Sequence, residues 1–415
     1  MRAAVGSTPI HSRLLLLNFE KDWEKMLPSD YDQYTPVINR FFRIETTTWG
    51  DEKKGLMVRY AGQLYNQDSA VAYDQLTQAL QPLSVTPIFR IEENKQVIYL
   101  IKEILKPKPT KIWPNIVFFI LTVVSVAFTG ALFSASSFPT NLAGWINFLA
   151  GGLPFAIALM AILVCHEFGH YLVGRFHKTA VTLPFFIPFP FSYFGTMGAF
   201  IQLKEPPKNR RILLDIGLAG PLAGLLIAIP VLLIGLYLSP VDRLPIVLPV
   251  GQIFEGNSIL YLLLKFIIKG QLLPQPFTFT GLSPIFYWIR YFFTGLPLPA
   301  GGLDVTLHPI AWAGWAGLLV TSLNLIPAGQ LDGGHIMYVL LGKYTNRLLP
   351  IILAALVLLG FVWNGWWLWA ALIFLLGRSH AEPLDQITQL DPKRQALALL
   401  GIIVFILVFM PVPLT

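Results

Sequence analysis

The chain of 415 residues is poor in charge and has one cysteine. That cysteine, Cys165, excludes an internal disulfide, a zinc site built from cysteines and an iron–sulfur cluster. Because Cys165 precedes a histidine in an apolar segment, we interpret it as a buried, unreactive thiol. Charged residues make up 13% of the chain, against about 25% in soluble domains. Any metal chemistry must therefore rely on histidines and carboxylates.

Charge is missing altogether from five long runs of the sequence. They are residues 112–166, 216–241, 305–331, 348–377 and 395–415. Each run is long enough to cross the hydrocarbon core of a lipid bilayer, which needs about 20 apolar residues. The sequence therefore predicts an α-helical polytopic membrane protein.

Basic residues cluster between these runs, and alternating spans put every cluster on one side of the membrane. The clusters are residues 102–111, 175–178, 204–211, 343–347 and 378–394. By the positive-inside rule that side is the cytoplasm or its equivalent, so the net charge of +7 reports topology and predicts no nucleic acid partner. We predict about seven spans, with the N-terminus inside and the C-terminus outside. In this count, residues 348–377 form a hairpin of two short helices, and the alternative is one long tilted helix.

Residues 1–111 have mixed charge and are predicted to be a soluble region on the cytoplasmic side. Within them, residues 55–103 have the pattern of a small β-α-β-β module, because a helical face is flanked by strand-like segments and a turn. Residues 1–50 are predicted to form a helix with connecting segments. The fold class is thus a helical membrane protein with a small α+β N-terminal domain.

A zinc-binding pattern stands at the end of the first apolar run, in Cys165-His166-Glu167-Phe168-Gly169-His170. Histidines at i and i+4 lie on one helix face and can reach the same tetrahedral Zn²⁺ ion. The neighbouring Glu167 can hold and deprotonate a water molecule on the metal. Two histidines that only pack helices are the alternative, but a glutamate in an apolar segment is costly without a role.

A hydrolytic zinc ion needs a third protein ligand and an open position. The run 305–331 descends toward the same side as the zinc motif and ends at Asp332, which therefore reaches the depth of His166. Asp215 stands at a helix start beside a basic residue, and Glu205 lies in a basic loop. We predict Asp332 as the ligand, turned inward by the break at Pro327 and the two glycines after Asp332.

Asn324 precedes Asp332 at the broken end of the same helix. Its amide can donate to a developing oxyanion or pair with a substrate backbone, and a hydrogen bond across helices is the alternative. Pro327 is predicted to contact substrate. His335 is either a partner of the metal ligands or a surface histidine.

Residues 182–203 are apolar but contain too many prolines for a helix. We predict a re-entrant, partly β segment beside the zinc helix, and an apolar interfacial loop is the alternative. In the first case the segment, including Gly198 and Ala199, can pair with a substrate as an added strand.

The zinc motif, together with Asn324-Leu325-Ile326-Pro327-Ala328-Gly329-Gln330-Leu331-Asp332-Gly333, resembles the paired signature of the site-2 protease family of intramembrane zinc metalloproteases, peptidase family M50. Gly198-Ala199 and Gly220-Pro221-Leu222-Ala223-Gly224 also resemble that family's core. The resemblance covers about residues 112–376, and leaves 377–415 as a polar loop and a last transmembrane helix. The N-terminal module and Leu307-His308-Pro309 resemble the plant and cyanobacterial subgroup.

The resemblance implies a zinc metalloendopeptidase that cleaves transmembrane protein substrates within or near their spans, in regulated intramembrane proteolysis. It also implies a bacterial inner membrane or a thylakoid membrane, with the active site toward the cytoplasmic side. No PDZ-like domain is predicted between the third and fourth helices. The alternative function is a membrane metal transporter or metal-binding sensor, which should show ionisable groups in several spans or an internal repeat.

Overall fold

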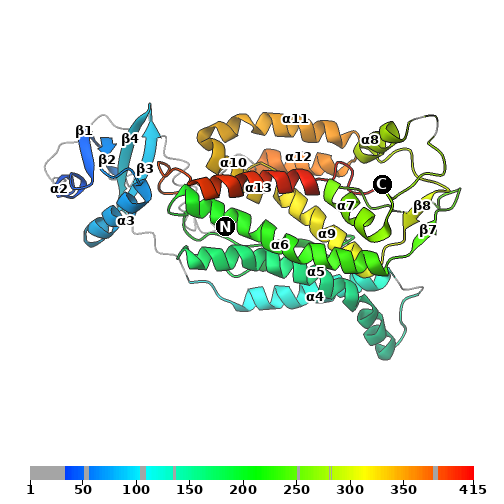
Figure 1. The fold of residues 1–415 in the computed structure, drawn as a ribbon. Helices are drawn as coiled ribbons and strands as arrows, with labels where there is room; N and C mark the ends of the chain where they lie inside the picture. Colours follow the sequence, from blue (N-terminus) through cyan, green and yellow to red (C-terminus); the bar gives the residue numbers. More distant parts are fainter. Residues whose placement is uncertain are drawn as a thin grey trace, which may run out of the picture.

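The computed structural model describes residues 33–50, 56–102, 109–133, 137–249, 253–279, 281, 283–376 and 382–415. An N-terminal module with a small sheet lies at one end of a helical body (Figure 1). A region of short helices and strands lies at the other end, near the C-terminus. The chain is thus mostly helical, as predicted.

The N-terminal module is a four-stranded antiparallel sheet in the order β1-β2-β4-β3, with its own hydrophobic core. Its elements are α2 (Thr35–Ile38), β1 (Phe42–Trp49), β2 (Leu56–Leu64), α3 (Ser69–Leu80), β3 (Thr86–Glu92) and β4 (Lys95–Ile101). Asp68 caps α3 by accepting a hydrogen bond from the Ala70 N–H, 3.1 Å away. The predicted strand–helix–strand–strand order over residues 55–103 is present, with Glu93 and Asn94 at positive φ in the hairpin turn.

The predicted helix with connecting segments over residues 1–50 is wrong where the structure describes a strand, at residues 42–49. Residues 1–32 lie outside the described part of the chain. The strand β1 is rich in β-branched and aromatic residues, which favour a pleated conformation. A bulge between Ile44 and Thr46 interrupts its alternation, and this hides the period of two in the sequence.

The helical body contains the predicted apolar helices and one helix that was not predicted. The predicted ones are α4 (Trp113–Leu132), α5 (Leu142–Phe176), α6 (Arg210–Leu238), α9 (Pro309–Asn324), α11 (Leu349–Gly360), α12 (Gly365–Leu376) and α13 (Pro392–Val408), and the further one is α10 (Asp332–Leu341). Glycines let their backbones approach closely. A Cβ on Gly152 of α5 would lie 1.9 Å from the Ala127 carbonyl oxygen of α4, and one on Gly235 of α6 would lie 2.2 Å from the Ala311 nitrogen of α9.

Three of these helices, α4, α5 and α6, are long and apolar enough to cross a membrane. The pair formed by α10 and α11 passes the same test as one span, bent by 116°. The helices α9 and α13 have 16 and 17 residues, fewer than the about 20 of a full crossing. The helix lengths therefore support a membrane protein, and the count of seven spans stays a prediction.

The segment after the zinc helix is partly β, as predicted. Strand β5 (Phe185–Pro188) pairs antiparallel with β6 (Thr196–Phe200). Further along the chain, the far end holds β7 (Val241–Arg243), α7 (Ile259–Lys269), α8 (Pro284–Thr294) and β8 (Leu303–Val305). The helix α8 and the β7–β8 pair had no predicted counterpart.

Candidate metal centre

Two histidines of α5 face the same point in the interior. His166 and His170 are 2% and 6% exposed, and their Nε2 atoms lie 3.3 Å apart. The Nδ1 atom of His170 donates a hydrogen bond to the Ile216 carbonyl oxygen of α6, 2.7 Å away. Because Nδ1 carries the proton, the lone pair is on Nε2. The hydrogen bond to the Ile216 carbonyl therefore fixes both the tautomer and the orientation of the His170 ring.

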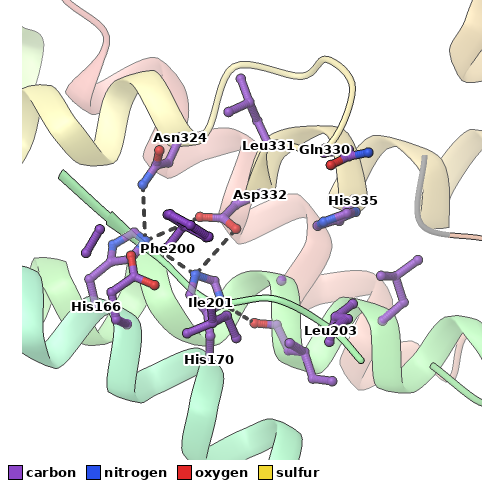
Figure 2. A pocket seen from close by; sticks show the side chains of 15 residues that line it. His166, His170, Phe200, Ile201, Leu203, Asn324, Gln330, Leu331, Asp332 and His335 are labelled. Atoms are coloured by element: carbon purple, nitrogen blue, oxygen red, sulfur yellow. Dashed lines mark hydrogen bonds and ion pairs between the residues drawn. The ribbon is translucent and has the colours of Figure 1, made fainter. Parts of the chain in front are cut away.

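Asp332, at the start of α10, faces the two histidines from the other side of the site (Figure 2). Its Oδ2 lies 3.4 Å from the His166 Nε2, and its Oδ1 lies 3.4 Å from the His170 Nε2. As the first residue of α10, it has its carboxylate at the positive end of that helix. One ligand atom from each of the three residues lies within 4.8 Å of the others.

Glycines make the turn before Asp332 tight enough for this approach. A Cβ on Gly333 would lie 2.0 Å from the Leu325 carbonyl oxygen, and one on Gly334 would lie 2.3 Å from the Gly329 carbonyl oxygen. Gly329 itself has a φ of +58°, which a residue with a side chain rarely adopts. The chain can therefore fold back directly after Asn324 and bring Asp332 beside His166 and His170.

The three ligand side chains fit a zinc ion. Atoms bound at about 2.0–2.1 Å to a tetrahedral ion lie about 3.3–3.4 Å from one another. The two Nε2 atoms lie 3.3 Å apart, and each lies 3.4 Å from a different oxygen of the Asp332 carboxylate, so the two imidazoles and the carboxylate surround one point at close to this spacing. Two imidazoles and a carboxylate are also a common zinc ligand set with one position left open.

Two further predicted residues lie beside the ligands. Glu167 is 4% exposed and lines the same cavity. The Nδ2 atom of Asn324 lies 3.2 Å from the His166 Nε2, so its amide donates toward the centre of the site. A carboxylate and an amide donor thus flank the ligand atoms.

Small residues on α6 make room for the imidazoles. A Cβ on Gly220 would lie 2.0 Å from the His170 Nε2, and one on Gly224 would lie 3.0 Å from the His166 Nδ1. A Cβ on Gly217 would lie 3.2 Å from the His335 Cβ. Gly220 and Gly224, part of the segment that resembles the family's core, therefore border the two histidines themselves.

The site opens into a cavity with a volume of about 180 Å³. Apart from the residues already described, its walls come from β6 and the segment that follows it, α6 and the turn before α10. They are Ala199, Phe200, Ile201, Leu203, Leu213, Ile216, Gly217, Gln330, Leu331 and His335. Ala199 lies in the wall as predicted, whereas Gly198 and Pro327 do not line the cavity. Cys165 does not line it either.

Sequence reasoning left three features of the site unassigned. His335 lines the cavity three residues after Asp332, a spacing that places both on one face of α10. The Ile216 carbonyl had no sequence signal, because every residue carries one. Asp215, the rejected ligand candidate, instead lies 2.9 Å from the His177 Nε2 and accepts two hydrogen bonds from Arg394, at 2.8 and 2.6 Å.

Known proteins are similar to this chain over most of its length. The probable zinc metalloproteases EGY1 and EGY2, chloroplastic, of Arabidopsis thaliana are 28% and 31% identical to it, over 75% and 65% of the chain. EGY1 of Oryza sativa subsp. japonica is 27% identical over 75% of the chain. These matches cover 56%, 43% and 52% of the relatives, so the chain spans about half of their length.

No solved structure matches the chain. The model of peptidase family M50 matches residues 154–363, which include both histidines, Glu167, Asn324 and Asp332. The family and the plastid-type relatives confirm the resemblance that the paired motifs indicate. The chain belongs to peptidase family M50.

Proposed function

We propose that the chain is an intramembrane zinc metalloprotease that hydrolyses peptide bonds within or near the membrane-spanning segments of protein substrates. The observation that carries this proposal is the approach of His166, His170 and Asp332 to one point, beside the buried Glu167 and among apolar helices. The family, and relatives named as probable zinc metalloproteases, support it.

His166, His170 and Asp332 would hold the zinc ion. A bound zinc ion lowers the pKa of a water molecule from 15.7 toward about 7 and polarises a peptide carbonyl. The Glu167 carboxylate accepts the proton of the attacking water and returns it to the nitrogen of the leaving amine. The Asn324 amide donates a hydrogen bond to the carbonyl oxygen as negative charge develops on it.

The substrate is a transmembrane protein whose scissile segment must leave the helical conformation, because helical carbonyls are occupied by hydrogen bonds. Strand β6 is the proposed binding strand, since Ala199, Phe200 and the following Ile201 line the cavity. An extended segment paired with β6 would present its backbone to the ligand atoms. Gly198 and Pro327 border this path and are proposed to contact substrate outside the cavity.

The proposed topology has seven spans, with the zinc site toward the cytoplasmic side of a bacterial inner membrane or a thylakoid membrane. It divides the chain into a soluble N-terminal region (1–111), the protease core (112–376), and a polar loop with a C-terminal transmembrane helix (377–415). The basic residues at the ends of the helices support this orientation. A metal transporter or sensor is not favoured, because the candidate metal ligands of the described residues form one cluster.

Cleavage of candidate transmembrane segments by the purified protein in proteoliposomes tests the proposal. We expect Glu167→Gln to lower cleavage by about 10²–10⁴, because general base catalysis is lost, while the variant keeps zinc. Cys165→Ser, which changes the adjacent residue outside the cavity, should cleave as the unchanged protein does. A zinc chelator should abolish cleavage, and added zinc should restore it.

Cleavage by Glu167→Gln within tenfold of the unchanged protein would contradict the assigned role. Zinc uptake into the proteoliposomes without cleavage would instead support the transporter.

A further inference from the structure

Residues 383–388, which we call the strap, connect the N-terminal module to the helical body. They follow a segment after α12 and precede α13, far in sequence from the module. The backbone N–H of Phe89 in β3 donates to the Leu384 carbonyl oxygen at 2.9 Å, and the N–H of Gln386 donates to the Phe89 carbonyl oxygen at 3.1 Å. The strap thus adds in parallel to β3, the edge strand of the sheet.

The other edge of the strap pairs with the segment that precedes α6. The N–H groups of Leu384 and Asp385 donate to the carbonyl oxygens of Pro207 and Lys208, at 2.9 and 2.8 Å. Asn209 follows directly and caps α6 by accepting a hydrogen bond from the Ile212 N–H, at 3.0 Å. The strap is therefore held between the module and the connection from β6 to α6.

Asp385 lies buried between the strap and the module and hydrogen-bonds to both. It is 0% exposed, and its Oδ2 accepts a hydrogen bond from the Ser69 Oγ at the start of α3, 2.9 Å away. The Thr388 hydroxyl donates to the same oxygen, while the Oδ1 accepts from the Ile387 N–H at 2.8 Å. A buried carboxylate with one partner in the module and the rest in the strap makes their contact specific.

Two ion pairs and the guanidinium of Arg90 lie around the contact between the module and the strap. Lys208 Nζ lies 2.8 Å from the Asp74 Oδ1, and Arg211 Nη1 lies 3.1 Å from the Asp68 Oδ2. The Arg90 Nη1 donates to the carbonyl oxygens of Pro383 and Leu384, at 3.1 and 2.9 Å. Each contact joins the module to the strap, to the segment before α6 or to the first turn of α6.

The strap also contacts the helix that begins with Asp332. The Gln386 Nε2 donates a hydrogen bond to the Tyr338 hydroxyl of α10, at 2.8 Å. The module is thus connected through one short segment to two walls of the cavity, β6 with its connection to α6 on one side and α10 on the other. In the part of the chain that the structure describes, the strap contributes the buried Leu384 and the half-buried Ile387 to the hydrophobic core of the module.

We propose that the N-terminal module, docked through the strap, positions the substrate-binding wall of the cavity, and that Asp385 is the positioning residue of this contact. This inference rests on the proposed protease function. Releasing the strap frees the connection between β6 and α6, so the binding-competent position of β6 is populated less and the KM rises. The zinc ligands keep their places, because α5, which carries the histidines, packs against α6 and α9, and α10, which carries Asp332, packs against α6 and α13.

Asp385→Ala in the full chain, in proteoliposomes, tests the proposal. We expect the KM for a cleaved transmembrane segment to rise at least tenfold, with one zinc ion still retained per chain. Glu93→Gln, a change of an exposed carboxylate in the hairpin turn of the same module, is the control and should leave the KM unchanged.

A reversible disulfide distinguishes the effect of docking the strap on the module from a general loss of folding. The Ser69 and Thr388 hydroxyl oxygens lie 2.9 Å apart, so cysteines at these positions can form a disulfide in a Cys165→Ser background. In Asp385→Ala, oxidation of this pair should lower the KM again, and reduction should raise it. If Asp385→Ala does not fold, the same cysteine pair with Asp385 retained gives the comparison.

A KM that stays within twofold of the unchanged protein, or that is equal in the oxidised and reduced cysteine variants, would overturn the proposal. Loss of zinc from Asp385→Ala would also overturn it, because the residue would then support the ligands and not the substrate wall. Failure of the unchanged protein to cleave any segment would reject the proposed function itself. The activity of the unchanged protein is therefore measured before that of any variant.

Discussion

At the scale of single residues, the site depends on the absence of side chains as much as on their presence. Gly220 and Gly224 of α6 face the rings of His170 and His166, and a Cβ at either position would contact an imidazole. The i and i+4 spacing of the histidines is visible in the sequence. The need for glycines opposite them is not, because it arises from the packing of α5 against α6.

Gly220→Ala should displace His170, since the added Cβ would lie 2.0 Å from its Nε2. We expect metal affinity to fall at least tenfold, the scale of changes around a ligand. Gly151→Ala is the control, because nothing lies within 4 Å of a Cβ built there. Zinc per chain in a series of buffered zinc concentrations measures the effect. Equal zinc affinity in both variants would contradict the close packing of α6 on the ligand.

Much of the site could be predicted from the sequence, and the reasons differ by residue. Local spacing indicates His166, Glu167 and His170, whereas the selection of Asp332 required a topology that brings two helices to one depth. Gly198 and Pro327 were chosen from apolar or broken sequence, and neither lines the cavity. Phe200 and Ile201 of the wall fall in the segment 182–203 that was predicted to lie beside the zinc helix, whereas Leu213 and Ile216 could not be found, because apolar residues that line a cavity have the same sequence pattern as apolar residues in a core.

At the scale of secondary-structure elements, strand β6 is the element whose role depends most on geometry. Ile201 follows this strand and lines the cavity. Ile201→Pro should lower cleavage at least tenfold, because proline removes an N–H that could pair with substrate. Ile201→Val keeps the N–H and a similar shape, so it should cleave normally. Cleavage assays on variants with unchanged zinc content measure the effect, and a proline variant that cleaves normally would place the substrate elsewhere.

Elements with a clear apolar period or a charge-free run were predicted well, and elements without one were not. The runs 216–241 and 305–331 correspond to α6 and α9, and the hairpin expected in residues 348–377 is present as α11 and α12. The helix α8 was missed because its residues are mostly aromatic or β-branched, a composition that favours strands, and follow several prolines and glycines. Strand β1 was missed because its bulge interrupts the alternation.

At the scale of the whole molecule, the proposed orientation in the membrane rests on the positions of the basic residues. Cysteines at Glu93, Asp242 and Lys393, in a Cys165→Ser background, test the proposed topology. We expect a membrane-impermeant maleimide to label Glu93→Cys and Lys393→Cys from the cytoplasmic side, and Asp242→Cys from the opposite side. Asp242 follows the end of α6, whereas Lys393 lies at the start of α13. Labelling of Asp242→Cys and Lys393→Cys from the same side would contradict the seven-span order, because in that order α6 and α13 both begin on the cytoplasmic side.

The central claim is that topology brings Asp332 to the two histidines of α5 as the third ligand of a zinc ion. The most direct test is the zinc content of the purified protein and of Asp332→Ala, with Asp215→Asn as the control from the neighbouring helix α6. We expect about one zinc ion per chain in the unchanged protein and in Asp215→Asn, and a large loss in Asp332→Ala, since a three-ligand site with an open position has no ligand to spare. If Asp332→Ala keeps one zinc ion per chain at unchanged affinity, the third ligand lies elsewhere.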